Sequence, residues 1–249
     1  LKPFTWAQAD QATRDAFHGP NFARKFDELC GIVAGLGFKA IDIWVAHLDP
    51  FRASPGMVDE AVSILQKHDL KVVAYTAGLG RPDMTRQEGE QVYKVAKQIG
   101  APLLGVGLNP TNARLAYELG KEYGIKYAIE NHPERNPQEV LARIGDYGEV
   151  IGVAQDTGFW GMFDYDAVKA TYELKDHLLH MHLKQMRKTD DHWHCCAYSD
   201  GVVNVKGVVE ALKDIGYKGA VSVEIETVDH DPTDEVVRSL KDLKSWLAA

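Results

Sequence analysis

The chain has 249 residues, 45% of them hydrophobic, and 28 basic against 36 acidic residues give a formal net charge of −8. This size suits a single globular domain over residues 1–249. The acidic balance argues against nucleic-acid binding, which usually needs a basic face, and no run of about 18 apolar residues could span a membrane. The three cysteines, Cys30, Cys195 and Cys196, form no disulfide framework, which favours a reducing, cytoplasmic compartment. A tag, a disordered start or a removed signal peptide could precede Leu1.

Short apolar strands follow amphipathic helices along the chain, and the junction between them often carries a glycine. Glycine suits the left-handed residue that closes a helix. The apolar runs are nearly continuous, as expected for parallel strands covered by helices. Strands are predicted at Lys2–Trp6 and at residues 40–44, 72–75, 103–107, 127–130, 150–156, 177–184 and 220–224.

Helices are predicted between these strands, and several of them have a proline just before their first turn, where a missing N–H costs little. They are expected at residues 22–35, 57–68, 85–99, 111–123, 137–145, 164–173, 204–215 and 233–247. Alternating strands and helices predict a parallel sheet. Eight such units favour an α/β fold of the (β/α)₈ TIM barrel type over an open sheet, since the chain contains neither GxGxxG nor GxxxxGK[ST].

The longest stretch predicted to be irregular runs from residue 184 to residue 203. It contains charged, imidazole, thiol and aromatic side chains, namely Arg187, Lys188, His192, Trp193, His194, Cys195, Cys196 and Tyr198. A long loop in a compact domain is usually functional or mobile. In a barrel it would cover the catalytic face. A small zinc site at residues 192–196 lacks a second pair of ligands at suitable spacing, so a lid is preferred.

The last four predicted strands each end in a polar group that an apolar core would not select. These groups are Glu130, Asp156, His182 and Glu224. Active sites of barrels lie at this carboxyl-terminal face. Three converging carboxylates are costly to bury unless a cation compensates them. A divalent ion is the simplest solution, and these donors suit Mn²⁺, the expected ion, or Mg²⁺, Co²⁺ or Zn²⁺.

Two further histidines lie close to these ligands in the sequence. His180 and His182 point the same way because side chains alternate along a strand. His182 is nearer the carboxyl end, so it is the predicted ligand and His180 a deeper, hydrogen-bonded core residue. His132 is predicted to lie behind the ligands, within reach of a substrate.

The sequence resembles the xylose isomerase-like TIM barrels, often called sugar phosphate isomerases/epimerases, over nearly its whole length. The matching pieces are GFKAIDIW (37–44), AIENH (128–132), QDTG (155–158), HMHLK (180–184) and ALKDIGYKGAVSVE (211–224). The resemblance implies that the four strand-end residues ligate the metal. In the ketose epimerases of this family the two glutamates also shuttle protons, so Glu130 and Glu224 are the implied catalytic residues.

This chemistry agrees with the residue types. A metal that chelates a carbonyl and a neighbouring hydroxyl acidifies the adjacent C–H. One glutamate removes the proton to give a metal-bound enediolate, and the other returns it. Return to the opposite face of the same carbon makes an epimerase, and return to the neighbouring carbon makes an isomerase. Loss of a β-hydroxyl makes a lyase (a dehydratase) of an oxidised sugar or glycoside. The expected partner is a small carbohydrate, and whether the chain forms a homo-oligomer stays open.

The chain departs from the family where substrate is expected to bind. Phe159 stands where family members often have a histidine, and Gln185 replaces an acidic residue. The predicted substrate contacts are Lys184, His132, Trp160, Arg187 and His47, with a solvated loop as the alternative for Arg187. An aromatic wall for a sugar ring is the alternative to core packing for Phe159, Trp160, Trp6, Trp44 and Trp193.

Two other function classes compete with this prediction. Some relatives with this barrel are apurinic-site endonucleases that bind three zinc ions, and His47, His192 and His194 invite that comparison. The acidic net charge and Phe159 argue against it. A non-catalytic binding subunit is the third class, and the intact set of four ligands argues against that.

Overall fold

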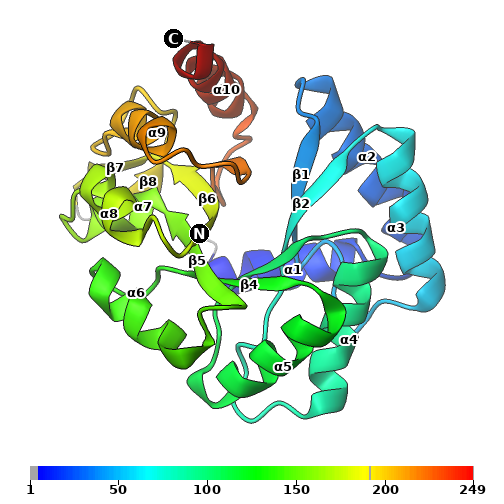
Figure 1. Cartoon of the computed structure of the whole chain (residues 1–249). Helices are drawn as coiled ribbons and strands as arrows, with labels where there is room; N and C mark the ends of the chain where they lie inside the picture. The colour runs from blue at the N-terminus through cyan, green and yellow to red at the C-terminus, as the bar shows by residue number, and fades with distance from the viewer. Residues whose placement is uncertain (1–4, 191, 249) are drawn as a thin grey trace. The chain divides into compact units, whose positions relative to one another are not determined.

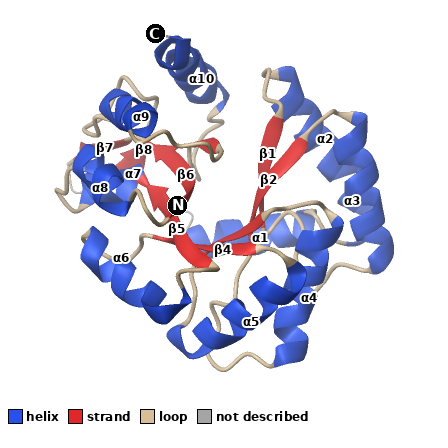
Figure 2. Cartoon of the chain, in the orientation of Figure 1, coloured by secondary structure: helices blue, strands red, loops and turns tan. Residues whose placement is uncertain are grey.

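A computed structural model describes residues 5–190 and 192–248 (Figure 1). The chain divides into two compact units, Leu1–Tyr127 and Ala128–Ala249. Strands and helices alternate along both units, as predicted (Figure 2). Among the described residues, no helix combines the length and the apolar character that crossing a membrane requires. The three cysteines are buried and free. The prediction of one domain over residues 1–249 stays a prediction.

The first unit contains three parallel strands and the helices between them. Its elements are α1 (Trp6–Ala16), η1 (Gly19–Asn21), α2 (Phe22–Gly35), β1 (Ala40–Trp44), α3 (Pro55–Lys67), β2 (Lys71–Thr76), α4 (Arg86–Gln98), β3 (Leu103–Val106), η2 (Pro110–Asn112) and α5 (Ala113–Tyr123). β1 pairs in parallel with β2, and β2 with β3. In Figure 1, α2 and α3 lie along one side of β1 and β2.

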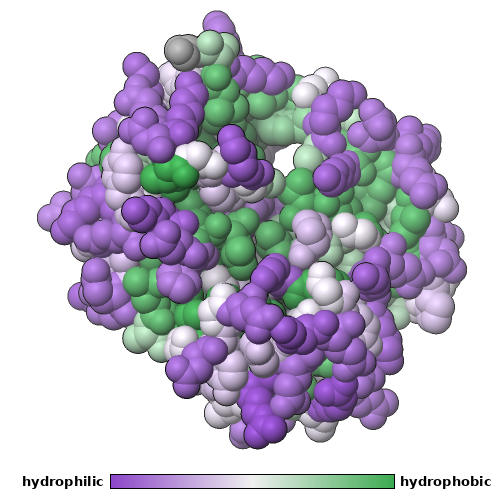
Figure 3. All heavy atoms as spheres, viewed as in Figure 1, coloured by the Kyte–Doolittle hydropathy of each residue, from purple (hydrophilic) through white to green (hydrophobic). Residues whose placement is uncertain are grey.

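Local sequence signals explain where these helices begin and end. The Thr85 hydroxyl accepts a hydrogen bond from the Glu88 N–H, and the Glu88 carboxylate accepts one from the Thr85 N–H. This capping box starts α4. At the start of α3, just before a proline, the Ser54 hydroxyl accepts a hydrogen bond from the Met57 N–H. Gly124 ends α5 with φ of 67°, a left-handed conformation that glycine adopts without strain. Over α4 and α5 the surface is mostly hydrophilic (Figure 3), because their apolar faces point into the unit.

The second unit contains the strands that carry the candidate site. It begins within β4 (Lys126–Glu130), whose first two residues belong to the first unit. Its other elements are α6 (Pro137–Ile144), η3 (Gly145–Tyr147), β5 (Ile151–Asp156), α7 (Thr157–Met162), α8 (Ala167–Leu174), β6 (Leu178–Lys184), β7 (Met186–Thr189), β8 (His192–Cys195), α9 (Val205–Asp214), β9 (Val221–Glu224) and α10 (Thr233–Ala248). β5 pairs in parallel with β6, and β6 with β9. Their register sets Asp156 beside His182 and Lys184 beside Glu224. Every residue of β5 is buried, as its continuous apolar run predicted.

The structure corrects the prediction at the start of the chain. Residues 2–4 of the predicted strand at Lys2–Trp6 lie outside the described residues. Trp6 itself begins α1, because Thr5 and Gln8 form a capping box at its start. Helix α7, which begins directly after Asp156, was also not predicted.

Residues 184–203 were predicted to be irregular throughout. The structure corrects this prediction, because the stretch contains an antiparallel hairpin of β7 and β8. Met186 and Cys195 face each other and are buried, whereas Arg187 and His194 pair on the exposed face. Three of the four residues of β7 and two of the four residues of β8 are polar, so no apolar run marked either strand in the sequence. The buried amide of Gln185 then fastens the segment that follows, donating to the Tyr198 and Val203 carbonyls and accepting from the Met186 and Val203 N–H groups.

Candidate metal centre

The structure brings together the four residues that the sequence places at strand ends. Each of Glu130, Asp156, His182 and Glu224 offers one ligand atom such that all four atoms lie within 4.8 Å of one another. They come from β4, β5, β6 and β9 of the second unit. The first three are buried and Glu224 is partly exposed. The group therefore has both the donor types and the spacing that a single divalent ion requires.

His182 is the link between the two glutamates. Its Nδ1 lies 2.7 Å from Glu130 Oε1 and 3.0 Å from Glu224 Oε2. Nδ1 is therefore the ring nitrogen that faces the carboxylates. His180 is fully buried and lies 3.2 Å from the Ser222 hydroxyl, which agrees with its predicted place as a deeper, hydrogen-bonded residue.

Asp156 is held by the start of α7, where it is the N-cap residue. Its Oδ1 accepts hydrogen bonds from the backbone N–H groups of Gly158 at 2.7 Å and Phe159 at 3.2 Å. Its Oδ2 faces Lys184 Nζ at 2.7 Å. The helix therefore fixes the carboxyl in one orientation, with a single oxygen turned toward the other ligands.

Lys184 lies inside this group, although the sequence predicted it as a substrate contact. It is 3% exposed. Its ammonium lies 2.7 Å from Asp156 Oδ2, 2.9 Å from Glu224 Oε1 and 2.8 Å from Glu226 Oε2. Buried ammonium and carboxylate groups are retained only when they are paired. In the structure the Lys184 ammonium therefore forms ion pairs with the carboxylates of Asp156, Glu224 and Glu226.

Burial and close pairing shift the pKa values of these groups in different directions. Burial acts to raise the pKa of Glu130, but hydrogen bonds with His132 and His182 outweigh it and hold that pKa below its usual range. Burial raises the pKa of Asp156 to about 7, although the Lys184 ammonium works against it. Burial also acts to lower the pKa of Lys184, but the surrounding carboxylates raise it well above its usual range. Burial therefore destabilises the ionised form of Asp156, and further positive charge beside the carboxylate would stabilise it.

The sequence reasoning missed three residues that shape the centre. Asn131 is fully buried, donates to the Asp156 carbonyl at 2.9 Å and accepts from the Asp156 N–H at 2.6 Å. Thr157 exchanges two hydrogen bonds with the backbone of Lys184, and Glu226 pairs with the Lys184 ammonium. Their adjacency to predicted ligands was the available signal, because Asn131 and Thr157 directly follow ligands and Glu226 lies two residues beyond Glu224.

Replacing Asn131 by alanine is expected to lower the affinity for a divalent ion by about 10–100-fold, the usual effect of removing a group that orients a ligand. The change would leave the buried N–H and carbonyl of Asp156 without these partners. Isothermal titration with Mn²⁺ measures the effect. Asn136→Ala is the matched control, because Asn136 caps α6 and contacts none of the four ligands. Equal affinities for the two variants would contradict the prediction.

The other predicted substrate contacts occupy different environments. His132 Nε2 lies 3.2 Å from Glu130 Oε2, and its ring packs 4.8 Å from that of Phe159. Trp160 has no exposed surface and packs against Tyr165, which favours the core-packing alternative, and its predicted substrate contact stays a prediction. Arg187 is exposed on β7, in agreement with the solvated alternative.

Of the aromatic residues proposed for a wall against a sugar ring, Trp6 and Trp44 contact each other, and Trp193 contacts a lysine instead. In the first unit, His47 follows β1 and packs against Phe17 and Trp44, and Trp6 stacks on Trp44 with ring centroids 5.6 Å apart. In the second unit, the ring of Trp193 lies under Lys188 Nζ at 5.8 Å.

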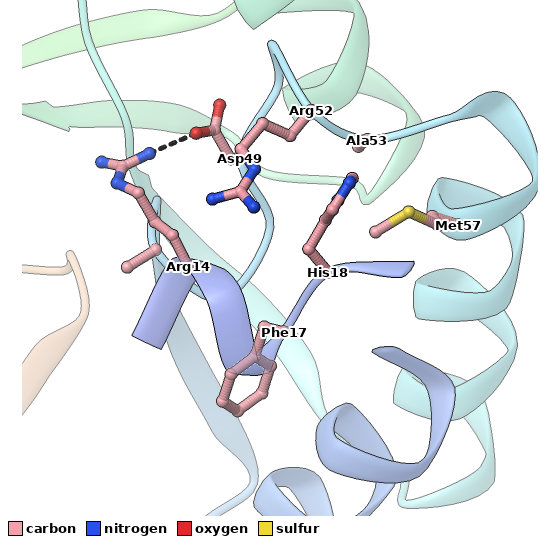
Figure 4. A pocket seen from close by; sticks show the side chains of 8 residues that line it. Arg14, Phe17, His18, Asp49, Arg52, Ala53 and Met57 are labelled. Atoms are coloured by element: carbon pink, nitrogen blue, oxygen red, sulfur yellow. Dashed lines mark hydrogen bonds and ion pairs between the residues drawn. The ribbon is translucent and has the colours of Figure 1, made fainter. Parts of the chain in front are cut away.

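A small pocket lies in the first unit (Figure 4). It is lined by Arg14, Phe17, His18, Ala46, Asp49, Arg52, Ala53 and Met57. Arg14 pairs with Asp49 and Asp10, and Arg52 pairs with Asp15 at 2.9 Å. The cationic groups of this pocket are therefore already compensated, which leaves the strand-end group in the second unit as the better candidate site.

Comparison with known proteins agrees with this fold. Residues 30–247 match the family described as xylose isomerase-like TIM barrel. The chain is 27% identical over 139 residues to the uncharacterized protein MJ1311 of Methanocaldococcus jannaschii, and the aligned part is 52% of this chain and 45% of that protein. The chain thus matches less than half the length of this curated relative.

Three solved structures resemble the chain at low sequence identity. A xylose isomerase-like TIM barrel protein from Mycobacterium smegmatis, in complex with magnesium, has a TM-score of 0.74 and 15% identity over 90% of this chain and 89% of that one. The probable 3-DHS dehydratase AsbF from Bacillus anthracis has a TM-score of 0.70 and 14% identity over 88% and 93%. The 3-keto-D-glucoside 4-epimerase YcjR from E. coli has a TM-score of 0.67 and 16% identity over 92% and 96%.

At such identities the structural likeness establishes the fold alone, and it confirms the predicted α/β barrel. The family match establishes membership of the family, since it spans most of the sequence. The chain belongs to the xylose isomerase-like TIM barrel family.

Proposed function

We propose that the protein is a divalent-metal-dependent isomerase or epimerase that moves a proton next to the carbonyl of a sugar or keto-sugar. The observation that carries this proposal is the group of four ligand atoms within 4.8 Å, two of which belong to glutamates. A carboxylate at such a site can hold an ion and also accept a proton. Resemblance to a 3-keto-D-glucoside 4-epimerase supports the same reaction class.

The residues present fit a divalent ion. Three carboxylates and one imidazole suit Mn²⁺ best, with Mg²⁺, Co²⁺ and Zn²⁺ as alternatives. Glu224 Oε2 is buried beside His182 Nδ1 at 3.0 Å, and because a carboxylate oxygen can accept about two hydrogen bonds, it keeps a lone pair for an ion. When bound, the ion would polarise a substrate carbonyl and its neighbouring hydroxyl and so acidify the C–H between them.

The two glutamates are the residues proposed to move the proton. Glu130 is oriented from both sides by His132 and His182, and Glu224 is oriented by His182 and Lys184. One glutamate takes the proton from carbon and the other returns one. Return to the opposite face of the same carbon gives an epimer, and return to the neighbouring carbon gives an isomer.

A lyase acting on an oxidised sugar or glycoside is the second candidate, and Phe159 favours it. The Phe159 ring packs against His132 and lies 5.1 Å from Lys184 Nζ. A phenyl ring cannot hydrogen-bond a substrate hydroxyl as a histidine would. In this alternative one glutamate removes the proton next to the carbonyl, and the other donates a proton to the β-hydroxyl, which leaves as water. Resemblance to a probable dehydratase supports it. For either reaction a reducing compartment such as the cytoplasm is proposed, since the cysteines are free.

The test is incubation with Mn²⁺ in D₂O across a panel of ketoses, keto-acids and oxidised glycosides. Deuterium is expected at the carbon next to the carbonyl of one substrate class, and its incorporation should stop when a chelator removes the metal. NMR of the product then distinguishes an epimer, an isomer and a dehydrated product. Protein that binds no divalent ion, or that exchanges no proton with any member of the panel, would refute the proposal.

A further inference from the structure

The Lys184 side chain is held in place from both ends. At its base, the Thr157 hydroxyl donates to the Lys184 carbonyl at 2.7 Å and accepts from the Lys184 N–H at 2.9 Å. Along its stem, a Cβ on Gly158 would lie 2.7 Å from Lys184 Cγ and Cδ, so the absence of a side chain at Gly158 makes room for it. At its tip, the ammonium contacts three carboxylates. These contacts fix the Lys184 side chain among the proposed metal ligands.

The oxygen that Lys184 contacts on Asp156 is the one that an ion would need. Each carboxylate oxygen can accept about two hydrogen bonds. Asp156 Oδ1 already accepts two, from the N–H groups of Gly158 and Phe159. An ion bound by Asp156 must therefore approach Oδ2, where the Lys184 ammonium lies at 2.7 Å. Two cations at one oxygen repel each other strongly in a buried site.

Glu226 provides an alternative partner for the ammonium. Its Oε2 lies 2.8 Å from Lys184 Nζ, and Glu226 is not among the four clustered ligands. Its negative charge is therefore available to Lys184 when an ion takes up the charge of Asp156.

We propose that Lys184 is an internal counter-ion that competes with the divalent ion for Asp156 Oδ2 and so sets the metal affinity, and that Glu226 retains the ammonium when the ion binds. This inference rests on the proposed metal site. Lys184 and Glu226 are positioning residues in this scheme, because they act on the ion through Asp156.

Titration of chelator-treated protein with Mn²⁺ in a calorimeter tests the competition. Lys184→Met removes the competing charge and is expected to tighten Mn²⁺ binding by at least about tenfold. Lys184→Gln is expected to act in the same direction and serves if the methionine variant does not fold. Lys206→Met, an exposed position on α9, is the matched control and should leave the affinity unchanged. Thermal denaturation of the same samples should show a lower Tm for chelated Lys184→Met that Mn²⁺ restores, since the carboxylates lose their counter-ion.

A double-mutant cycle tests the part played by Glu226. Glu226→Gln alone should weaken Mn²⁺ binding. Without the charge of Glu226, the Lys184 ammonium interacts more strongly with Asp156 and Glu224 and competes better with the ion. In the Lys184→Met background this loss should shrink, because residues that act together are not additive. Equal or weaker binding by both Lys184 variants, or an unchanged loss from Glu226→Gln, would overturn the inference while leaving the metal site in place. Wild-type protein that binds no Mn²⁺ would instead overturn the proposed function.

Discussion

Replacing Glu224 by glutamine is expected to slow substrate deuterium exchange by about 10²–10⁴-fold, the range over which a positioned acid or base contributes to catalysis. The amide keeps the size of the side chain and an oxygen that can accept from Lys184, but it cannot take up a proton. Glu130→Gln should act similarly. The exchange rate in D₂O with saturating Mn²⁺ measures both variants.

Because Glu224 is also a proposed metal ligand, Mn²⁺ affinity must be measured beside the exchange rate. The decisive comparison is made at Mn²⁺ concentrations that saturate both proteins. Glu210→Gln provides the control, since Glu210 is exposed on α9 and pairs only loosely with Lys206. If Glu224→Gln exchanges protons at the wild-type rate once its site is saturated, Glu224 has no role in proton transfer.

Replacing Trp160 by alanine is expected to lower the free energy of unfolding by about 3–5 kcal/mol, the usual cost of removing a large aromatic side chain from a core. Trp160 is among the largest fully buried side chains and packs against Tyr165. Chemical denaturation followed by circular dichroism measures the loss. Trp193→Ala on the hairpin, where the ring is only partly buried, should cost much less.

The same pair of variants decides between the two interpretations of Trp160. A core role predicts reduced stability with little change in KM for whatever substrate the deuterium panel identifies. Unchanged stability with a raised KM would instead support the substrate contact that the sequence predicted.

The seven strands β1–β6 and β9 were predictable because each is a short apolar run following a helix. The four strand-end residues were predictable because a charged group directly after such a run is costly unless it has a function. The hairpin of β7 and β8 was not predictable in this way, since its exposed face carries charged and imidazole side chains that interrupt any apolar run. Helix α1 was missed because its sequence is mostly polar and none of its residues is buried, so no core-facing apolar run marked it.

The position of Lys184 shows why part of the site could not be read from the sequence. A lysine at the end of a strand is usually solvated, and only the register between β6 and β9 sets Lys184 beside Glu224. The contact with Asp156 depends further on the missing side chain of Gly158. The contact among Lys184, Asp156 and Gly158 depends on how the elements pack, which the sequence does not reveal, whereas the end of a strand can be recognised from local composition.

Asp156 performs two tasks with one side chain, and this limits what can replace it. Asparagine is as good a helix cap as aspartate but would bring no charge to an ion. Glutamate would bring the charge on a longer stem, which is a poor fit to the N–H groups of Gly158 and Phe159. Metal preference can therefore be engineered more freely at Glu130 or Glu224, which start no helix, than at Asp156.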